Sequence, residues 1–281
     1  VYHSDPLCIM PRMTAVRWRL IRSTPMSGPE NMALDEAILE SVSSGASPPT
    51  LRLYAWNPPC LSLGYAQVSE LVDLEKLQEL GWDLVRRPTG GKAILHTDEL
   101  TYSVAGLIRD PLFSGGVLAS YKRLSAGLMR ALQDLGLDPE LRVNSPDLAS
   151  NGDSPVCFEV PGAYEITWAG KKLLGSAQLR RARAVLQHGS LPLEGDIARI
   201  SRVLRVQDRE QASRSVRQAA ATVEQALGQR VSWEQVAAAV VSGFRKALDL
   251  ELVEDQPSPA ELVRSRELRD ERYGRFEWTY R

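Results

Sequence analysis

The spacing of apolar residues divides the chain into helices and short strands that do not follow a regular strand–helix–strand repeat. A helix is predicted over residues 27–42, where a turn-spaced pattern begins with Met32. Ser27 and Glu30 have the spacing of a capping box at its start, and Gly45 is expected to end it. Further helices are predicted at residues 70–80 and 118–135.

Alternating or short apolar runs predict the strands of this chain. They lie at residues 51–56, 60–64, 82–87, 93–96, 100–105, 156–160, 164–168, 172–175 and 184–188. The turn signal Ala169–Gly170 joins two of them as a hairpin, so the sheet is expected to be largely antiparallel. The predicted fold class is α/β of the α+β kind, with a mixed, largely antiparallel sheet flanked by helices.

The last third of the chain is predicted to be helical. Ser232 and Gln235 form one capping box, Ser258 and Glu261 form a second, and Gly274 is expected to end the last helix. We interpret these helices as structural.

Composition narrows the class of protein only modestly. The 281 residues are 43% hydrophobic and 25% charged, which excludes disordered and fibrous proteins. A net charge of −1 gives no long-range attraction to nucleic acid or to an anionic membrane, and no apolar run has membrane-spanning length. The three cysteines form no CxxC pair and no leader is recognisable, so a cytoplasmic location is expected.

Two segments carry candidate chemistry. Gly90 and Gly91 lie between two predicted strands, where exposed amides could hold a carbonyl oxygen or a phosphate, although a glycine pair is also an ordinary turn. Cys157 and Lys172 lie on one hairpin-sized segment and could serve acyl transfer, because a nearby ammonium stabilises a thiolate. Cys157 alone, between Val156 and Phe158, would equally fit a small buried side chain.

The three histidines form no metal signature with cysteines or carboxylates, so no metal is expected. His96 and His188 could be general bases or hydrogen-bonded histidines of the sheet. Arg180, Arg181 and Arg183 could dock an acidic carrier protein or could belong to a solvated surface.

The run from residue 86 to 104 resembles the lipoate- and biotin-protein ligase superfamily, whose lipoyl branch carries an Arg-Arg-x-Thr-Gly-Gly loop followed by a histidine. Residues 31–36 resemble the first helix of that branch, and residues 172–178 resemble its lysine-bearing hairpin. The resemblance implies the catalytic-domain fold of the superfamily. We expect an extension at 1–13 and a single catalytic domain over 14–281, with a core at about 45–250 and C-terminal helices over 219–274.

Within the superfamily, residues 156–159 resemble the octanoyltransferase family, an acyltransferase family of lipoate biosynthesis. The resemblance implies transfer from octanoyl-acyl carrier protein to a lipoyl-domain acceptor such as the glycine-cleavage H protein. It implies Cys157 as the thioester-forming nucleophile, Lys172 as its catalytic partner, and no ATP or other cofactor. The implied substrate-binding residues are Arg87, Thr89, Gly90, Gly91, His96, Gly175, Ser176, Ala177 and His188.

Three alternatives stay open at the level of sequence. An ATP-dependent lipoate ligase would share the glycine and lysine motifs but lack the cysteine, and Lys92 stands where ligases commonly have a third glycine. An amidotransferase acting between two lipoyl domains would also use a cysteine. A non-catalytic module would bind octanoyl or lipoyl groups without turnover.

Overall fold

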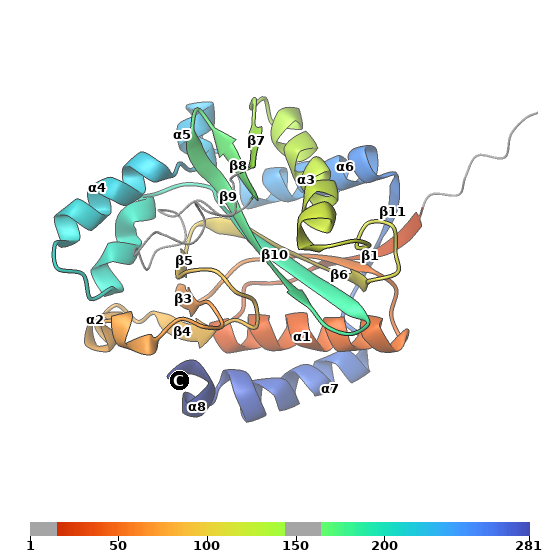
Figure 1. Cartoon of the computed structure of the whole chain (residues 1–281), viewed down its shortest axis with the longest axis horizontal. Coiled ribbons are helices and arrows are strands. Elements are labelled where there is room, and N and C mark those ends of the chain that lie inside the picture. Colours follow the sequence, from red (N-terminus) through yellow and green to blue (C-terminus); the bar gives the residue numbers. More distant parts are fainter. Residues whose placement is uncertain (1–15, 144–163) are drawn as a thin grey trace, which may run out of the picture.

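The structure, a computed structural model, describes residues 16–143 and 164–281 (Figure 1). The predicted extension at 1–13, the predicted strand at 156–160 and the candidate nucleophile Cys157 lie outside these residues and stay predictions.

An eight-stranded sheet crosses the centre of the described part. Its strands in spatial order are β11 (Leu250–Asp255), β1 (Val16–Arg22), β2 (Thr50–Tyr54), β6 (Glu99–Leu107), β10 (Ala184–Pro192), β9 (Lys171–Arg180), β8 (Tyr164–Trp168) and β7 (Glu140–Val143). Every pairing from β2 to β7 is antiparallel, whereas β1 runs parallel to both β2 and β11. The predicted largely antiparallel sheet is therefore confirmed, as is the hairpin at Ala169–Gly170, where both residues have positive φ.

A second, three-stranded sheet lies beside the first. Strand β3 (Cys60–Leu63) is central, with β4 (Asp83–Arg86) parallel on one side and β5 (Ile94–His96) antiparallel on the other. The loop that connects β4 to β5 contains Gly90 and Gly91. The small sheet thus carries the loop motif toward the large sheet.

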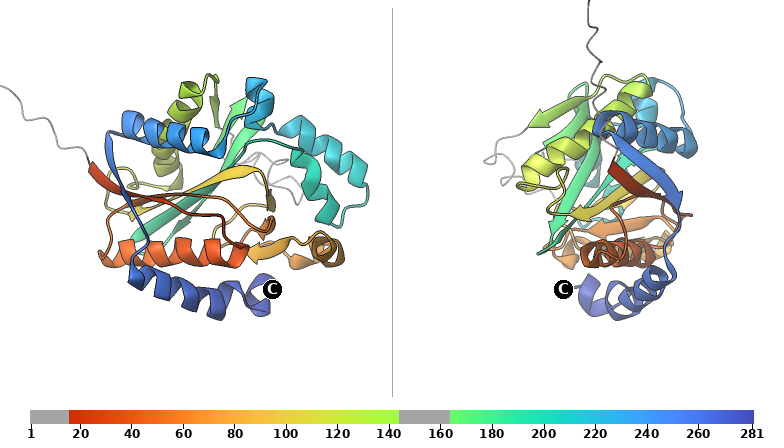
Figure 2. Two further views of the ribbon diagram at one scale, coloured as in Figure 1. Left: turned by 180° about the vertical axis from the view of Figure 1, so that it is seen from behind. Right: turned by 90° about the vertical axis from the view of Figure 1, so that its right-hand side faces the viewer.

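Helices cover both faces of the large sheet (Figure 2). On one face, α1 (Gly28–Ser44) packs through Leu34 and Ile38 against strand residues such as Ile21. The predicted capping box at Ser27 and the stop at Gly45, with φ of 81°, are both confirmed. Helix α7 (Pro259–Leu268) lies along the outer side of α1.

On the other face, α3 (Val117–Asp134) and α6 (Trp233–Leu248) cross each other closely. Leu128 and Phe244 join the strand residues Leu20 and Val104 in the largest apolar core. Because Leu20 and Ile21 are consecutive strand residues, their side chains point to opposite faces, and each face receives its own helices.

The shorter elements are η1 (Ser69–Leu71), α2 (Leu74–Glu79), η3 (Ile197–Val203), α4 (Arg209–Ala219), α5 (Val223–Leu227), the π-helical turn η4 (Arg269–Tyr273) and α8 (Phe276–Thr279). The predicted continuous helix over 70–80 is wrong, because the Asp73 side chain caps a new helix by accepting from Lys76 N. No helix in the described ranges is long and apolar enough to cross a membrane.

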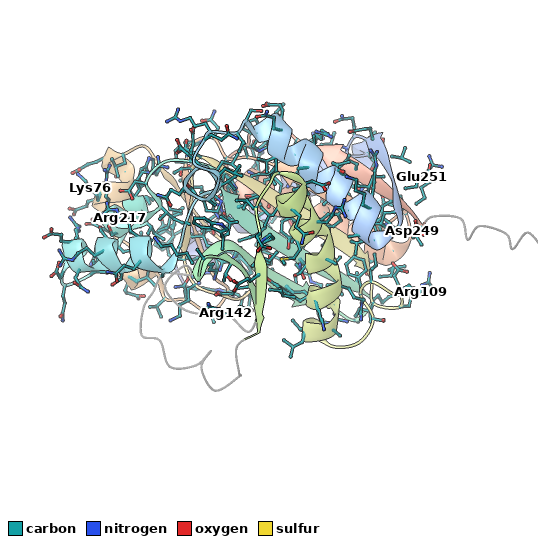
Figure 3. The ribbon with its side chains drawn as sticks, turned by 90° about the horizontal axis from the view of Figure 1, so that it is seen from above. Lys76, Arg109, Arg142, Arg217, Asp249 and Glu251 are labelled. Carbon is teal, nitrogen blue, oxygen red and sulfur yellow. The ribbon has the colours of Figure 1, made fainter. Side chains whose placement is uncertain are left out.

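Charged side chains mark the periphery (Figure 3). Lys76 and Arg217 project from the end of the molecule that carries α2 and α4, while Asp249 and Glu251 project from the end that carries β11. These exposed charges are distinct from a set of buried charged residues that surround the candidate site.

Candidate active site

A cavity lies where the small sheet meets β9 and β10 of the large one. It brings together seven of the nine residues that the sequence predicted to bind substrate: Arg87, Gly91, His96, Gly175, Ser176, Ala177 and His188. Aromatic and aliphatic side chains, including Met32, Tyr54, Trp56 and Ile94, supply much of the remaining wall. Segments more than 100 residues apart in the chain therefore form one pocket, and substrate binding by these residues stays a prediction.

The glycine loop has a shape that depends on glycine. Gly91 has φ of 92°, a conformation that L side chains rarely adopt. Its carbonyl oxygen also approaches Gly64 so closely that a Cβ atom on Gly64 would lie 1.8 Å from it. Gly90 and Gly91 are both exposed, and Gly91 lines the cavity.

Arg87 holds this loop in place. Its Nε and Nη2 atoms donate to Gly90 O at 3.2 and 3.0 Å, and Nη2 also donates to Lys92 O at 2.7 Å. On the other side, Nη1 donates to Ser62 O at 3.0 Å. Arg87 is buried and lines the cavity, so it both shapes the loop and forms part of the cavity wall.

His188 connects the glycine loop to helix α1. Its Nε2 atom forms a hydrogen bond with Thr89 Oγ1 at 2.6 Å, and its Nδ1 atom lies 3.6 Å from Asp35 Oδ2. The second distance exceeds that of a direct hydrogen bond, so the interaction with Asp35 is mainly electrostatic. Burial lowers the pKa of His188 although Asp35 opposes the shift.

Asp35 is itself fixed by three donors. Arg52 Nη1 donates to it at 2.7 Å, Tyr54 OH at 2.9 Å and Ser103 Oγ at 2.8 Å. Burial would raise the pKa of Asp35, but attraction to Arg52 and to His188 holds it below its ordinary value. Sequence analysis missed Asp35 and Arg52. The signal in the sequence was a charged residue at an inward-facing position, in a predicted helix for Asp35 and in a predicted strand for Arg52.

His96 has a partner at each ring nitrogen. Nε2 lies 2.7 Å from Ser62 Oγ, Nδ1 lies 2.7 Å from Glu99 Oε1, and the ring stacks on Trp56 with centroids 4.0 Å apart. Ser190 Oγ also donates to Glu99, at 2.5 Å. This arrangement favours the reading of His96 as a hydrogen-bonded sheet histidine that shapes the cavity wall.

The strands β9 and β10 form the opposite wall. Their antiparallel register places Ala177 beside His188 and Ser176 beside Gly189. Ser176 Oγ lies 2.8 Å from Tyr102 OH, and a Cβ atom on Gly189 would lie 2.6 Å from the Tyr102 ring. Gly189 is thus the residue that lets Tyr102 reach the wall.

Lys172 lies at the start of β9, outside the cavity lining. Its Nζ atom is 2.5 Å from Glu165 Oε1, and both side chains are almost fully buried, with 6% and 7% exposed. The Lys172 carbonyl accepts from Ala221 N at 3.0 Å. Cys157 lies outside the described residues, so the predicted pairing of Cys157 with Lys172 stays a prediction.

Sequence comparison decides the family. The chain matches the lipoyl protein ligase A/B catalytic domain over residues 27–245. The chain belongs to this family. The superfamily resemblance inferred from the glycine loop and the lysine hairpin is therefore confirmed.

Several relatives in the lipoyl protein ligase A/B family are named Octanoyltransferase LipM. The protein of Carboxydothermus hydrogenoformans is 39% identical over 268 residues, which cover 94% of this chain and 98% of the relative. The protein of Moorella thermoacetica is 40% identical over 279 residues, which cover 96% of this chain and all of the relative.

Solved structures of the family have the same fold. The bipartite lipoate protein ligase of Thermoplasma acidophilum has a TM-score of 0.79 at 28% identity, covering 94% of this chain and 96% of that one. A lipoate-protein ligase A bound with ATP also has a TM-score of 0.79 at 28% identity, covering 94% of this chain and 99% of that one. The predicted fold class is thereby confirmed.

The arginines that the sequence suggested for docking a partner are not part of the cavity lining. Arg180 donates to the backbone of Phe113 and Gly115 at 2.9 Å each, and Arg181 pairs with the buried Glu36, so both arginines have intramolecular partners. Among the residues that the structure describes, no group of three or more histidines, cysteines or carboxylates could hold a metal ion.

Proposed function

We propose that the protein is an octanoyltransferase of lipoate assembly. It takes the octanoyl group from octanoyl-acyl carrier protein, holds it as a thioester on Cys157, and passes it to a lysine of a lipoyl-domain protein, with the glycine-cleavage H protein as the expected acceptor. The observation that carries the proposal is the 39 to 40% identity with relatives named Octanoyltransferase LipM over nearly the whole of both chains.

Two exchanges account for the reaction. The Cys157 thiolate attacks the octanoyl carbonyl, a new C–S bond forms, and the pantetheine thiolate leaves and takes up a proton. The acceptor amine then attacks the same carbonyl, a C–N bond forms, and the Cys157 thiolate leaves while the amine loses its proton. The first exchange replaces one thioester by another and the second gives a more stable amide, so the proposal requires no nucleotide.

The cavity supports this proposal through its chemistry. Met32, Tyr54, Trp56 and Ile94 give it an apolar and aromatic wall suited to a saturated acyl chain. Gly91 lines the cavity and is exposed, so its backbone amide is a candidate to bind a carbonyl oxygen. In the proposal Lys172 favours the Cys157 thiolate, and Glu165 fixes the position of the Lys172 side chain.

Intact mass spectrometry tests the acyl-enzyme directly. After incubation with octanoyl-acyl carrier protein in the absence of ATP, we expect the wild type to gain the mass of one octanoyl group and Cys157→Ala to gain none. Cys60→Ala is the matched control and should still be acylated, because Cys60 is fully buried and burial raises the pKa of its thiol well above the ordinary value. An adduct that persists in Cys157→Ala would contradict the proposal.

A second candidate function is an ATP-dependent ligase, favoured by the structural match to a lipoate-protein ligase A bound with ATP. It predicts an acyl-adenylate from free octanoate or lipoate with ATP, and no adduct from octanoyl-acyl carrier protein. An amidotransferase would instead be acylated by an octanoylated lipoyl domain, and a non-catalytic module by neither donor.

A further inference from the structure

Arg86, the first arginine of the loop motif, has a different set of partners from its neighbour Arg87. Its side chain is completely buried, with 0% exposed. Strand β4 ends at Arg86, and the ladder continues through a hydrogen bond from Arg87 N to Leu63 O at 3.0 Å. Because successive strand residues point to opposite faces, Arg87 reaches the glycine loop while Arg86 reaches away from it.

The Arg86 guanidinium is surrounded by backbone carbonyl groups from two segments far apart in the chain. Six carbonyl oxygens accept from its nitrogens: those of Gly64, Tyr65, Gln67, Trp278, Thr279 and Arg281. A guanidinium has five N–H donors in a fixed plane, so six acceptors use its full capacity. Burial, together with the nearby charge of Arg281, lowers the pKa of Arg86, and the carbonyl dipoles stabilise the buried charge.

Side-chain contacts reinforce the same junction. Trp278 Nε1 donates to Arg86 O at 2.8 Å, so this tryptophan and this arginine exchange hydrogen bonds in both directions. The Arg281 guanidinium lies over the rings of Tyr65 and Trp278, 4.2 and 4.1 Å from their centroids. Ser69 Oγ donates to Tyr280 O at 3.0 Å.

The segment that Arg86 holds is in direct contact with the glycine loop. Tyr65 N donates to Thr89 O at 2.9 Å, and Gly64 packs against Gly91 without room for a side chain. Thr89 in turn bonds His188 at the cavity. Contacts therefore run without interruption from residues 278–281 through Arg86 to the candidate active site.

We propose that Arg86 and residues 278–281 form a clamp that positions the glycine loop for binding of the acyl group. Arg86 is a positioning residue in this proposal, because its guanidinium binds the carbonyl groups of residues 64–67 and Arg86 is not part of the cavity lining. The kinetic part of the proposal rests on the proposed octanoyl transfer, whereas the effect on the loop itself does not. Residues 278–281 then support the function of the site although they do not line the cavity.

The test compares deletion of residues 278–281 and Trp278→Ala with the wild type. We expect KM for octanoyl-acyl carrier protein to rise about tenfold, with kcat changed much less, because a displaced loop binds the donor poorly. Hydrogen exchange should accelerate in peptides containing residues 64–67 and 89–92. Glu277→Ala is the control, because Glu277 lies in the same short helix and is exposed, and it should leave KM and exchange unchanged.

Two further variants separate positioning from simple stabilisation. Trp278→Phe removes the hydrogen bond to Arg86 O but keeps an aromatic ring, and should have a smaller effect than Trp278→Ala. Arg86→Lys keeps the charge but not the planar set of donors, and should behave like the deletion. The clamp is refuted if the deletion lowers the melting temperature while KM and the exchange of residues 89–92 stay at wild-type values. If the wild type transfers no octanoyl group, the exchange result alone decides the question.

Discussion

Two adjacent carboxylates on α1 bind partners on different sides of that helix. Asp35 faces the sheet and accepts from Arg52, Tyr54 and Ser103, as described above. Glu36 faces away from it and accepts from Arg272 Nη1 at 2.6 and 2.7 Å and also from Arg181 and Tyr273. Burial would raise the pKa of Glu36, but these donors hold it below its ordinary value. Neighbouring side chains on a helix point about 100° apart, so Asp35 and Glu36 can bind different parts of the structure.

The buried pair of Lys172 and Glu165 allows catalysis to be separated from stability. Lys172→Met should lower the free energy of unfolding by about 3 kcal/mol, because it takes the nearest cation from a buried carboxylate. Urea unfolding would measure this loss. Acyl transfer should fall at least about a hundredfold, in keeping with the loss of an activating ammonium.

The matched variant is Lys172→Met combined with Glu165→Gln. Neutralising both partners should restore most of the lost stability, while acyl transfer stays as low as in the single variant. Recovery of transfer in the double variant would mean that Lys172 has only a structural role.

At the residue scale, sequence reasoning singled out residues where a motif fixed both residue type and spacing. Arg87, Gly91 and His188 line one cavity, and their role in substrate binding stays a prediction. It failed for Asp35 and Arg52, because a charged residue in an amphipathic pattern is normally read as solvent-exposed. Only the fold shows that each of these charges finds its counter-charge inside.

At the scale of elements, the crossing of α3 and α6 depends on two glycines. A Cβ atom on Gly243 would lie 2.3 Å from Gly127 O and 2.7 Å from Ala131 N, and backbone atoms cannot move aside easily. Gly243→Ala should therefore destabilise the protein by about 2 kcal/mol, since the two helices must separate. Thermal or urea unfolding would measure the effect.

The exposed face of α6 provides the comparison. Ala238 is exposed on the same helix, and Ala238→Ser should change the free energy of unfolding by less than about 0.5 kcal/mol. Equal effects at both positions would show that the close crossing does not limit stability.

Elements with local signals were predictable, and those that depend on distant contacts were not. The capping boxes at Ser27, Ser232 and Ser258 are all present, because each needs only residues three positions apart. The pairing of β1 with β11 joins segments separated by most of the chain, so no local pattern indicates it. Helix α4 has a single large apolar residue, the buried Val216, so its sequence gives only a weak apolar pattern for a helix prediction.

For the whole molecule, buried titratable groups predict how stability depends on pH. The folded state lowers the pKa of His188, so below about pH 6.5 the unfolded chain takes up a proton that the folded one resists, and stability falls as the pH falls. The lowered pKa of Asp35 contributes stability that is present above about pH 3.9 and lost as the pH falls further. Unfolding free energies measured from pH 8 to pH 4 should therefore be flat at first and then decline.

His188→Gln isolates the first of these contributions. The charged and titratable groups that act on His188 are Asp35, Arg87 and His96, and all three remain in the variant. Its stability should decline less steeply between pH 6.5 and 5 than that of the wild type. Identical slopes in the two proteins would assign the decline to other groups.

The parallel pairing of β1 with β11 also affects how the protein is made. The ribosome releases β1 long before residues 250–255, which form the strand that covers its outer edge. Until those residues emerge, the nascent chain carries an unpaired strand edge, and such edges pair readily with other chains. A chain truncated before residue 250 is therefore expected to expose this edge and to aggregate.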